Sequence, residues 1–159
     1  MSGGVAADVV RRSARRTGFD ETQLERQGIK YDAGAPVTAA VSVGTGVAAS
    51  FGDGVVRFFN PGEPPIAIEA HRGAVLCVAA EGVSDSVLTG GDDGRFLRVS
   101  PDGSIKEIAT FGTRWVDCVA AASGHYACSS GSVALVWRVD DTDAETFEHP
   151  STVGGLAFD

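Results

Sequence analysis

Short runs of apolar, β-branched and aromatic residues alternate with turns of Gly, Asp and Ser through most of the chain. Four of these runs share one pattern and read VTAAVS from Val37, VLCVAA from Val75, VDCVAA from Val116 and VGGLAF from Val153. They are spaced by 38, 41 and 37 residues. A pattern that recurs at a nearly fixed period indicates a repeated supersecondary unit.

A second series of runs follows the first three and has the same period. It reads GDGVVRFFN from Gly52, DDGRFLRVS from Asp92 and SGSVALVWRV from Ser130, and aligning Phe59, Val99 and Trp137 gives spacings of 40 and 38 residues. In the clearest repeat, strands are predicted over residues 75–80, 86–90, 95–100 and 105–110, without helical periodicity. Four short strands in about 40 residues are typical of one β-propeller blade.

These repeats predict an all-β fold over residues 31–159, built from β-propeller blades of four antiparallel strands. About three complete blades run from residue 36 to residue 148, and the start of a fourth follows. Because closed propellers contain roughly 4–8 blades, we expect an open or truncated ring. The missing blades are expected to come from the rest of the chain or from self-association.

Residues 1–30 are polar and contain several Arg residues, and no apolar stripe is present that would dock them, so we expect a mobile N-terminal extension. Ile29 and Tyr31 leave open an extra strand at its end. The uncharged stretch 33–52 has the length of a membrane span, but it lacks Leu and Ile and is interrupted by Gly and Pro. Two short strands and a turn are predicted there.

The second repeat resembles the WD-repeat family in AHRGAVLCVAA at 70–80 and SVLTGGDDGRFLRVS at 86–100. That family has Gly-His before the innermost strand, Ser or Thr on the second strand, Asp in the next turn and Trp-Asp after the third strand. His71, Thr89 and Asp93 match this pattern, whereas Val99 and Ser100 replace the Trp-Asp pair. The resemblance implies that the matching side chains belong to a structural hydrogen-bonded tetrad.

The other repeats match the family pattern only in part. The first has Asp53 in the turn but Phe59-Asn60 in the place of Trp-Asp, and the third has Trp137 but lacks the His and the Asp. His149 fills the His position of the fourth repeat. The resemblance therefore implies structural roles for Asp53, Trp137 and His149 as well, and a repeated position favours such a role for a histidine over catalysis.

Charge limits the classes of partner. The net charge is −8, but residues 1–30 carry six basic and four acidic residues, which leaves −10 on residues 31–159. A negative charge of this size repels phosphate backbones and acidic membrane surfaces. Neither nucleic acid nor a membrane is therefore an expected partner.

The sequence contains few residues in patterns typical of catalytic, metal-binding or cofactor-binding sites. Cys77, Cys118 and Cys128 are an odd number of cysteines at spacings unlike a zinc site, and they lie in apolar runs, so we expect reduced, buried thiols in a cytoplasmic protein. No Ser or Cys lies in a nucleophile motif. No catalytic, cofactor-binding or metal-binding residue is predicted, and the protein is not expected to be an enzyme.

The resemblance implies a non-catalytic protein–protein interaction scaffold with other proteins as partners. The candidate partner contacts are Arg72, Arg114 and Trp115, which lie in the segments that lead into innermost strands. Trp and Arg are also common interface anchors. Packing of Trp115 against its own blade is the alternative. The rival function is a propeller-based enzyme or a small-ligand or metal sensor with its site in the central channel, for which the innermost strands offer Asp117 and two cysteines.

Overall fold

The computed structural model describes residues 22–122 and 124–159. The chain divides into two compact units, residues 1–32 and residues 33–159.

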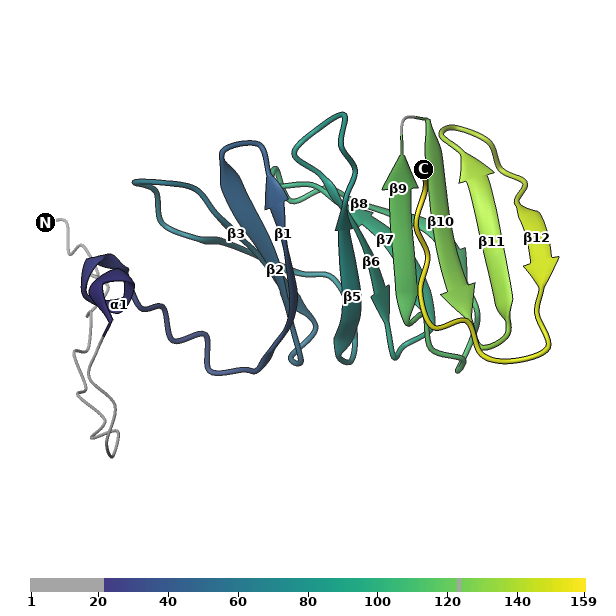
Figure 1. The fold of residues 1–159 in the computed structure, drawn as a ribbon, viewed down its shortest axis with the longest axis horizontal. Coiled ribbons are helices and arrows are strands. Elements are labelled where there is room, and N and C mark those ends of the chain that lie inside the picture. The colour runs from purple at the N-terminus through teal and green to yellow at the C-terminus, as the bar shows by residue number, and fades with distance from the viewer. Residues whose placement is uncertain (1–21, 123) are drawn as a thin grey trace, which may run out of the picture. The chain divides into compact units, whose positions relative to one another are not determined.

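In the second unit, the described residues form three four-stranded antiparallel sheets (Figure 1). The sheets follow one another along the chain, and the four strands of each follow one another within it. The first blade contains β1 (Val37–Val43), β2 (Gly46–Phe51), β3 (Val55–Phe59) and β4 (Ile66–Glu69). The second contains β5 (Val75–Ala80), β6 (Val87–Gly91), β7 (Arg95–Val99) and β8 (Ile105–Thr110), and the third contains β9 (Cys118–Ala122), β10 (His125–Ser130), β11 (Val133–Arg138) and β12 (Glu145–Glu148).

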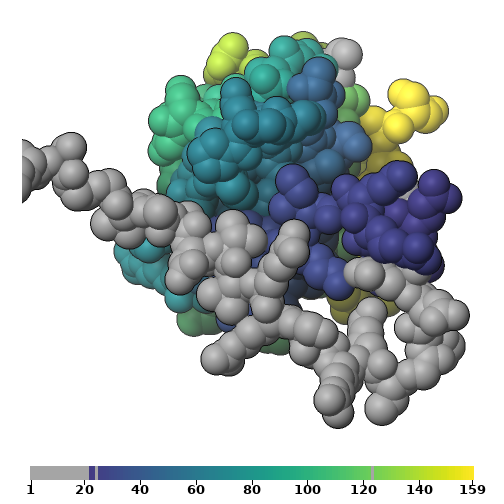
Figure 2. Space-filling view, turned by 90° about the vertical axis from the view of Figure 1, so that its left-hand side faces the viewer, coloured from purple at the N-terminus to yellow at the C-terminus, as the bar shows by residue number. Residues whose placement is uncertain are grey.

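This architecture confirms the predicted fold class: all-β, with three complete four-stranded blades that do not close into a ring. Figure 2 views the blades from the side of the first one, with parts of the third visible behind it. The strands of the clearest repeat begin and end within one residue of the predicted bounds. The uncharged stretch 33–52 forms β1, a tight turn and β2, as predicted. Within the described residues, no helix is long and apolar enough to cross a membrane.

Turns of Asp and Gly join the second and third strands of the first two blades. Gly54 and Gly94 have φ angles of 84° and 75°, which glycine adopts without steric cost. A Cβ atom at Gly54 would also collide with the carbonyl oxygens of His71 and Gly73. Glycine is therefore needed at this turn both for its backbone conformation and for the close approach of the next blade.

Two apolar seams hold the three blades together. The first seam, between the first and second blades, contains Val56, Phe58 and Ile68 on one side and Val75, Leu97 and Val99 on the other. The second seam, between the second and third blades, contains Leu88 and Phe96 against Val116, Cys128 and Trp137. Most of these side chains are fully buried, and apolar burial of this kind is the main stabilising contribution to a repeat stack.

The innermost strands β1, β5 and β9 run in the same direction (Figure 1). We call the edge of the blades at which they begin the entry edge, and the edge at which they end the exit edge. At the entry edge, the amide of Val116 donates to the carbonyl oxygen of Gly91 in the preceding blade, at 3.1 Å. This link explains why β9 begins at Cys118 and not at Val116, where the repeat pattern placed it.

Residues 153–159 take the place of a fourth innermost strand, but the structure assigns no strand there. The amide of Val153 donates to the carbonyl oxygen of Gly131 at 2.9 Å, which repeats the link made by Val116. The Phe158 ring lies 6.2 Å from the His125 ring, measured between centroids. The start of a fourth blade was expected over this segment, and the structure shows the backbone link of an innermost strand there without a strand.

The first unit is described only from residue 22 onward, so the mobility expected for residues 1–30 falls largely on residues outside the described part of the chain. A short helix, α1 (Gln23–Gln27), was not predicted. Its signal is a capping box: the amide of Glu25 donates to the Thr22 hydroxyl at 3.2 Å, and the amide of Thr22 donates to the Glu25 carboxylate at 2.8 Å. Ile29 and Tyr31 are exposed and lie outside any strand.

Candidate functional site

The entry edge brings together three of the residues singled out in the second repeat. His71 lies in the loop before β5, Thr89 on β6 and Asp93 in the turn between β6 and β7. The His71 ring is 2.8 Å from the Asp93 carboxylate through Nδ1 and 2.9 Å from the Thr89 hydroxyl through Nε2. Because a carboxylate only accepts hydrogen bonds, Nδ1 carries the proton and Nε2 accepts from the Thr89 hydroxyl.

Burial sets the charge state of this network. Burial lowers the pKa of His71 and outweighs the opposing effect of the Asp93 carboxylate, so the ring is neutral at neutral pH. Burial raises the pKa of Asp93, but hydrogen bonds from the Arg72 amide and from His71 outweigh it, and the pKa lies below its usual value. The network is saturated by its own members, which leaves His71 without a free nitrogen for acid–base chemistry.

In the first blade, the aspartate of the same turn has a different partner. Asp53 occupies the turn position of Asp93, but its partner is Arg57 on β3, with 2.9 Å between the guanidinium and the carboxylate. The Arg57 guanidinium also stacks over the Phe51 ring at 4.2 Å and donates to the carbonyl oxygen of Ala33. The hydrogen bond from Arg57 holds the pKa of Asp53 below its usual value. The partner of the turn aspartate is thus an arginine in the first blade and a histidine in the second.

The remaining candidate tetrad residues are not brought together with these. Trp137 lies on β11 and packs in the second seam, with its ring centroid 5.5 Å from that of Phe96. The side chain of His149 is exposed, and its amide donates to the carbonyl oxygen of Ser132. In the third blade, the Ser129 hydroxyl instead donates to the Asp117 carboxylate at 3.2 Å.

Arg72, Arg114 and Trp115 all lie on the entry edge, in the loops that lead into β5 and β9. Both arginines are exposed, and 61% of the Trp115 surface is accessible to solvent.

The loop that carries Arg114 and Trp115 is fixed on both sides. The amide of Phe111 donates to the carbonyl oxygen of Gly94 at 2.8 Å, and the amide of Val116 donates to that of Gly91. On the neighbouring loop, the Arg72 amide donates to Asp93 at 3.0 Å. These bonds hold an exposed aromatic ring and two guanidinium groups on a rigid backbone.

The innermost strands carry the residues on which the rival function would depend. Burial raises the pKa of Cys77 to about 12, and burial likewise raises the pKa of Cys128, so both thiols stay protonated and are poor nucleophiles at neutral pH. Asp117 is held by Ser129. Among the described residues, no group of three or more His, Cys, Asp or Glu side chains is close enough to hold a metal ion.

Sequence reasoning missed a polar cluster at the exit edge of the second seam. The Glu81 carboxylate is 2.7 Å from Arg98 Nε and 2.9 Å from its Nη2, and it also accepts hydrogen bonds from the Ser84 and Tyr126 hydroxyls. The signal was present, because Arg98 lies at a position of the repeat where the neighbouring repeats have the apolar residues Phe58 and Val136.

No family model matches the sequence, and no curated protein matches it either. Solved structures do match. A computationally designed protein, Ika8, superimposes with a TM-score of 0.65 at 18% identity, covering 77% of this chain and 40% of Ika8. The β-propeller domain of Cps50 (Swd1) from Myceliophteria thermophila gives a TM-score of 0.62 at 14% identity, covering 78% and 47% of the two chains. Raptor from Chaetomium thermophilum gives 0.64 at 18% identity, covering 79% and 14%.

These likenesses show the β-propeller fold of the chain. At such low identity they show nothing finer than the fold. The chain spans less than half of the length of each of these three structures.

Proposed function

We propose that this chain is a non-catalytic protein-interaction scaffold of the WD-repeat type, and that Arg72, Arg114 and Trp115 at the entry edge contact a partner protein. The observation that carries this proposal is the exposed Trp115 ring on a loop whose backbone is bonded to the preceding blade on both sides. Burial of a large apolar ring against a partner is favourable, and a rigid loop loses little entropy on binding.

Two further observations support the proposal. The hydrogen bonds of His71 with Thr89 and Asp93 are those that the WD-repeat resemblance implies, which favours that type of propeller over others. Arg114 directly precedes Trp115 in the same loop, and the ion pairs of the described residues include neither Arg114 nor Arg72. Arg and Trp together are the residues that most often dominate the binding free energy of an interface.

The test uses the 159-residue chain as bait and quantifies captured proteins by mass spectrometry for the wild type and for Trp115→Ala and Arg114→Ala. We expect at least one protein to be captured about tenfold less by Trp115→Ala, the effect of removing an interface anchor. Ile105→Ala and Arg138→Ala are the matched controls, because both residues are exposed at the exit-edge ends of their strands.

Equal capture by the wild type and by both entry-edge variants contradicts the proposal. Recovery of a bound metabolite or metal ion in place of a protein supports the alternative, an enzyme or ligand sensor with its site in the channel. The protonated Cys77 thiol and the Asp117–Ser129 hydrogen bond favour the scaffold over that alternative.

A further inference from the structure

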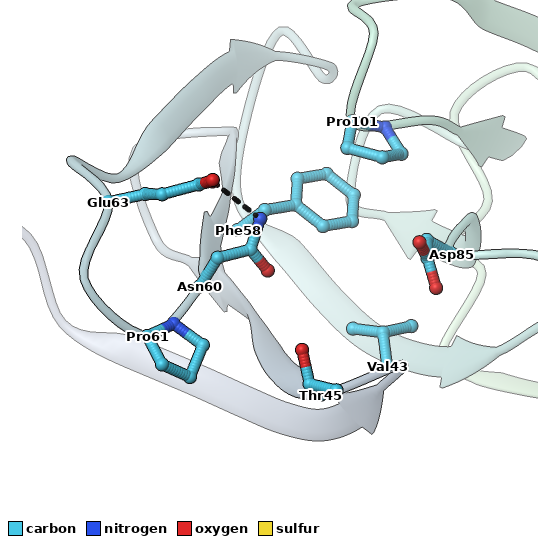
Figure 3. A pocket seen from close by; sticks show the side chains of 8 residues that line it. All are labelled: Val43, Thr45, Phe58, Asn60, Pro61, Glu63, Asp85 and Pro101. Atoms are coloured by element: carbon cyan, nitrogen blue, oxygen red, sulfur yellow. Dashed lines mark hydrogen bonds between the residues drawn. The ribbon is translucent and has the colours of Figure 1, made fainter.

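A cleft of about 430 Å³ opens at the exit edge of the first seam (Figure 3). Its floor is apolar and consists of Val43 and the ring of Phe58, which points toward Pro101 across the seam. Thr45 and Asn60 contribute polar atoms to the rim. The cleft is therefore amphipathic, with buried apolar groups below and hydrogen-bonding groups around its mouth.

Comparison with the second seam explains why the cleft exists. The pairing registers make Val43 equivalent to Glu81, Phe58 equivalent to Arg98, and Val87 equivalent to Tyr126. In the second seam, the three polar residues fill the exit edge, and the Glu81 carboxylate accepts hydrogen bonds from both Arg98 and Tyr126. The first seam has two valines and a phenylalanine instead, and the space remains open.

The mouth of the cleft carries two carboxylates. Glu63 and Asp85 lie on opposite sides of it, with the Phe58 ring between them (Figure 3). Glu63 accepts a hydrogen bond from the Asn60 amide at 3.3 Å, and the ion pairs of the described residues include neither carboxylate. Asp85 packs against the turn at Gly44, where a Cβ atom would lie 2.6 Å from its Oδ1. Both carboxylates are thus held beside the opening and face it without a cation.

A second, smaller hollow of about 240 Å³ adjoins the first and shares Val43 and Asp85 with it. It continues along the same seam to Ala80 and the exposed Val83, at the end of the innermost strand of the second blade. The two hollows together form a groove along the exit edge. A groove of this form has room for the backbone of an extended peptide beside a pocket for one side chain.

We infer that this groove binds an extended segment of a partner protein and that the cleft takes one arginine or lysine side chain from it. The methylene stem packs on Phe58 and the prolines, and the charged end lies between Glu63 and Asp85. The apolar floor favours a long side chain over a bare metal ion, which needs oxygen ligands on several sides. This site goes beyond the entry-edge contact and does not depend on it.

The first experiment is a titration of the ¹⁵N-labelled 159-residue chain, followed by NMR, with the peptide acetyl-Ala-Ala-Arg-Ala-Ala-amide. The matched probe has citrulline, which is neutral and of nearly the same shape, in place of the arginine. We expect the amide signals of Thr45, Asn60 and Asp85 to shift with the arginine peptide, and the citrulline peptide to bind at least about threefold more weakly. Raising the salt concentration should weaken only the arginine peptide.

The second experiment repeats the titration with Glu63→Gln and Asp85→Asn. Each should weaken binding by about threefold, and the double variant by about tenfold. Glu148→Gln is the matched control, since it removes an exposed carboxylate from the third blade, and it should bind as the wild type does. Trp115→Ala should also leave peptide binding unchanged, which separates this site from the proposed contact at the entry edge.

Equal binding of the two peptides overturns the inference, and so does unchanged binding by the double variant. Signals that shift only at the entry edge overturn it as well, while leaving the scaffold proposal in place. Because both substituted side chains are exposed, the variants should unfold at the same temperature as the wild type, and any loss of binding then reports on the groove.

Discussion

At the exit edge, the seam between the first and second blades is open, whereas the seam between the second and third blades is filled by side chains. The first is apolar at Val43 and Phe58 and ends in a cleft. The second continues its apolar core, with Phe96 against Trp137, into the hydrogen-bonded ion pair of Glu81 and Arg98. The same backbone positions thus complete one seam and leave the other with room for another molecule.

The difference shows that equivalent positions of a repeat fold can either join two blades or leave a cleft between them. A buried ion pair adds little net stability compared with apolar residues of the same size, but removal of one partner leaves the other charge uncompensated. The second seam therefore fixes two blades in one arrangement and is sensitive to single substitutions and to acid. At its exit edge, the first seam has apolar packing in place of such an ion pair, so this edge tolerates an open cleft.

The largest effect is expected from Phe96→Ala, which should lower the free energy of unfolding by about 4 kcal/mol because it leaves a cavity in a closed seam. Phe58→Ala should cost less, about 3 kcal/mol, because water enters the space from the adjoining cleft. Urea unfolding measures both. Phe147→Ala, at an exposed position, should change stability by less than about 0.5 kcal/mol. A greater loss at Phe58 than at Phe96 would show that the first seam is the tighter one.

The Glu81 carboxylate should make the stability of the second seam sensitive to acid, and Glu81→Gln should remove this sensitivity. Hydrogen bonds from Arg98 lower the pKa of Glu81 to about 2 from a usual value of 4.5. A depression of this size corresponds to about 3 kcal/mol of stability. That contribution is present above about pH 4.5 and is lost as the pH falls toward 2, where the carboxylate becomes protonated in the folded protein.

Unfolding of the wild type and of Glu81→Gln between pH 7 and pH 2 measures this effect. We expect the variant to be about 2–3 kcal/mol less stable at pH 7 and the gap to close as the pH approaches 2. Glu107→Gln is the control, because Glu107 pairs with Arg95 at the surface, and it should cost less than about 1 kcal/mol. A constant gap across the pH range would refute the assignment to Glu81.

Tyr126→Phe removes only the phenolic oxygen that links the third blade to Glu81. The expected loss is about 1 kcal/mol at pH 7, the contribution of one hydrogen bond. Burial and the Glu81 carboxylate raise the pKa of Tyr126 to about 12, so the hydroxyl keeps its proton and donates throughout the neutral range. The loss should be absent in a Glu81→Ala background, which lacks the acceptor, and a double-mutant cycle measures this; additive losses would show that the two residues do not interact.

The smallest effect is expected from Cys77→Ala. The thiol donates to the carbonyl oxygen of Val116 across the second seam at 3.5 Å, whereas the first blade has Ala39 at the equivalent position. The substitution should lower the free energy of unfolding by less than about 1 kcal/mol, because it places alanine where the first blade already has it. In the wild type, iodoacetamide should modify Cys77 more slowly than it modifies a free thiol, since burial raises its pKa to about 12. Rapid modification would contradict the packed arrangement.

Much of the fold was accessible from local patterns. The bounds of β5 to β8 were predicted to within one residue, because each strand is a short apolar run that ends at a Gly, Asp or Ser turn. The set formed by His71, Thr89 and Asp93 was accessible because its members match a family pattern at fixed spacing. The capping box at Thr22 and Glu25 was a local signal that was overlooked.

The rest of the candidate sites was not accessible in the same way. His149 occupies a histidine position of the repeat, yet its side chain is exposed, because no second strand lies beside it to supply a partner. Asp53 was matched to Asp93, but nothing in the repeat pattern indicated that Arg57 would take the place of histidine. Exposure of Trp115 depended on how its loop lies on the preceding blade, and the pattern allowed either outcome.

The sequence by itself determined the period, the number of strands in each unit and the positions of the turns, because these depend on alternation and on the backbone preferences of a few neighbouring residues. Only the tertiary structure decided what meets across the seams. Tyr126 and Glu81 are 45 residues apart and touch because two blades stack, and Phe58, Asp85 and Pro101 line one cleft for the same reason. Such contacts form between faces that do not adjoin along the chain, so no local pattern records them.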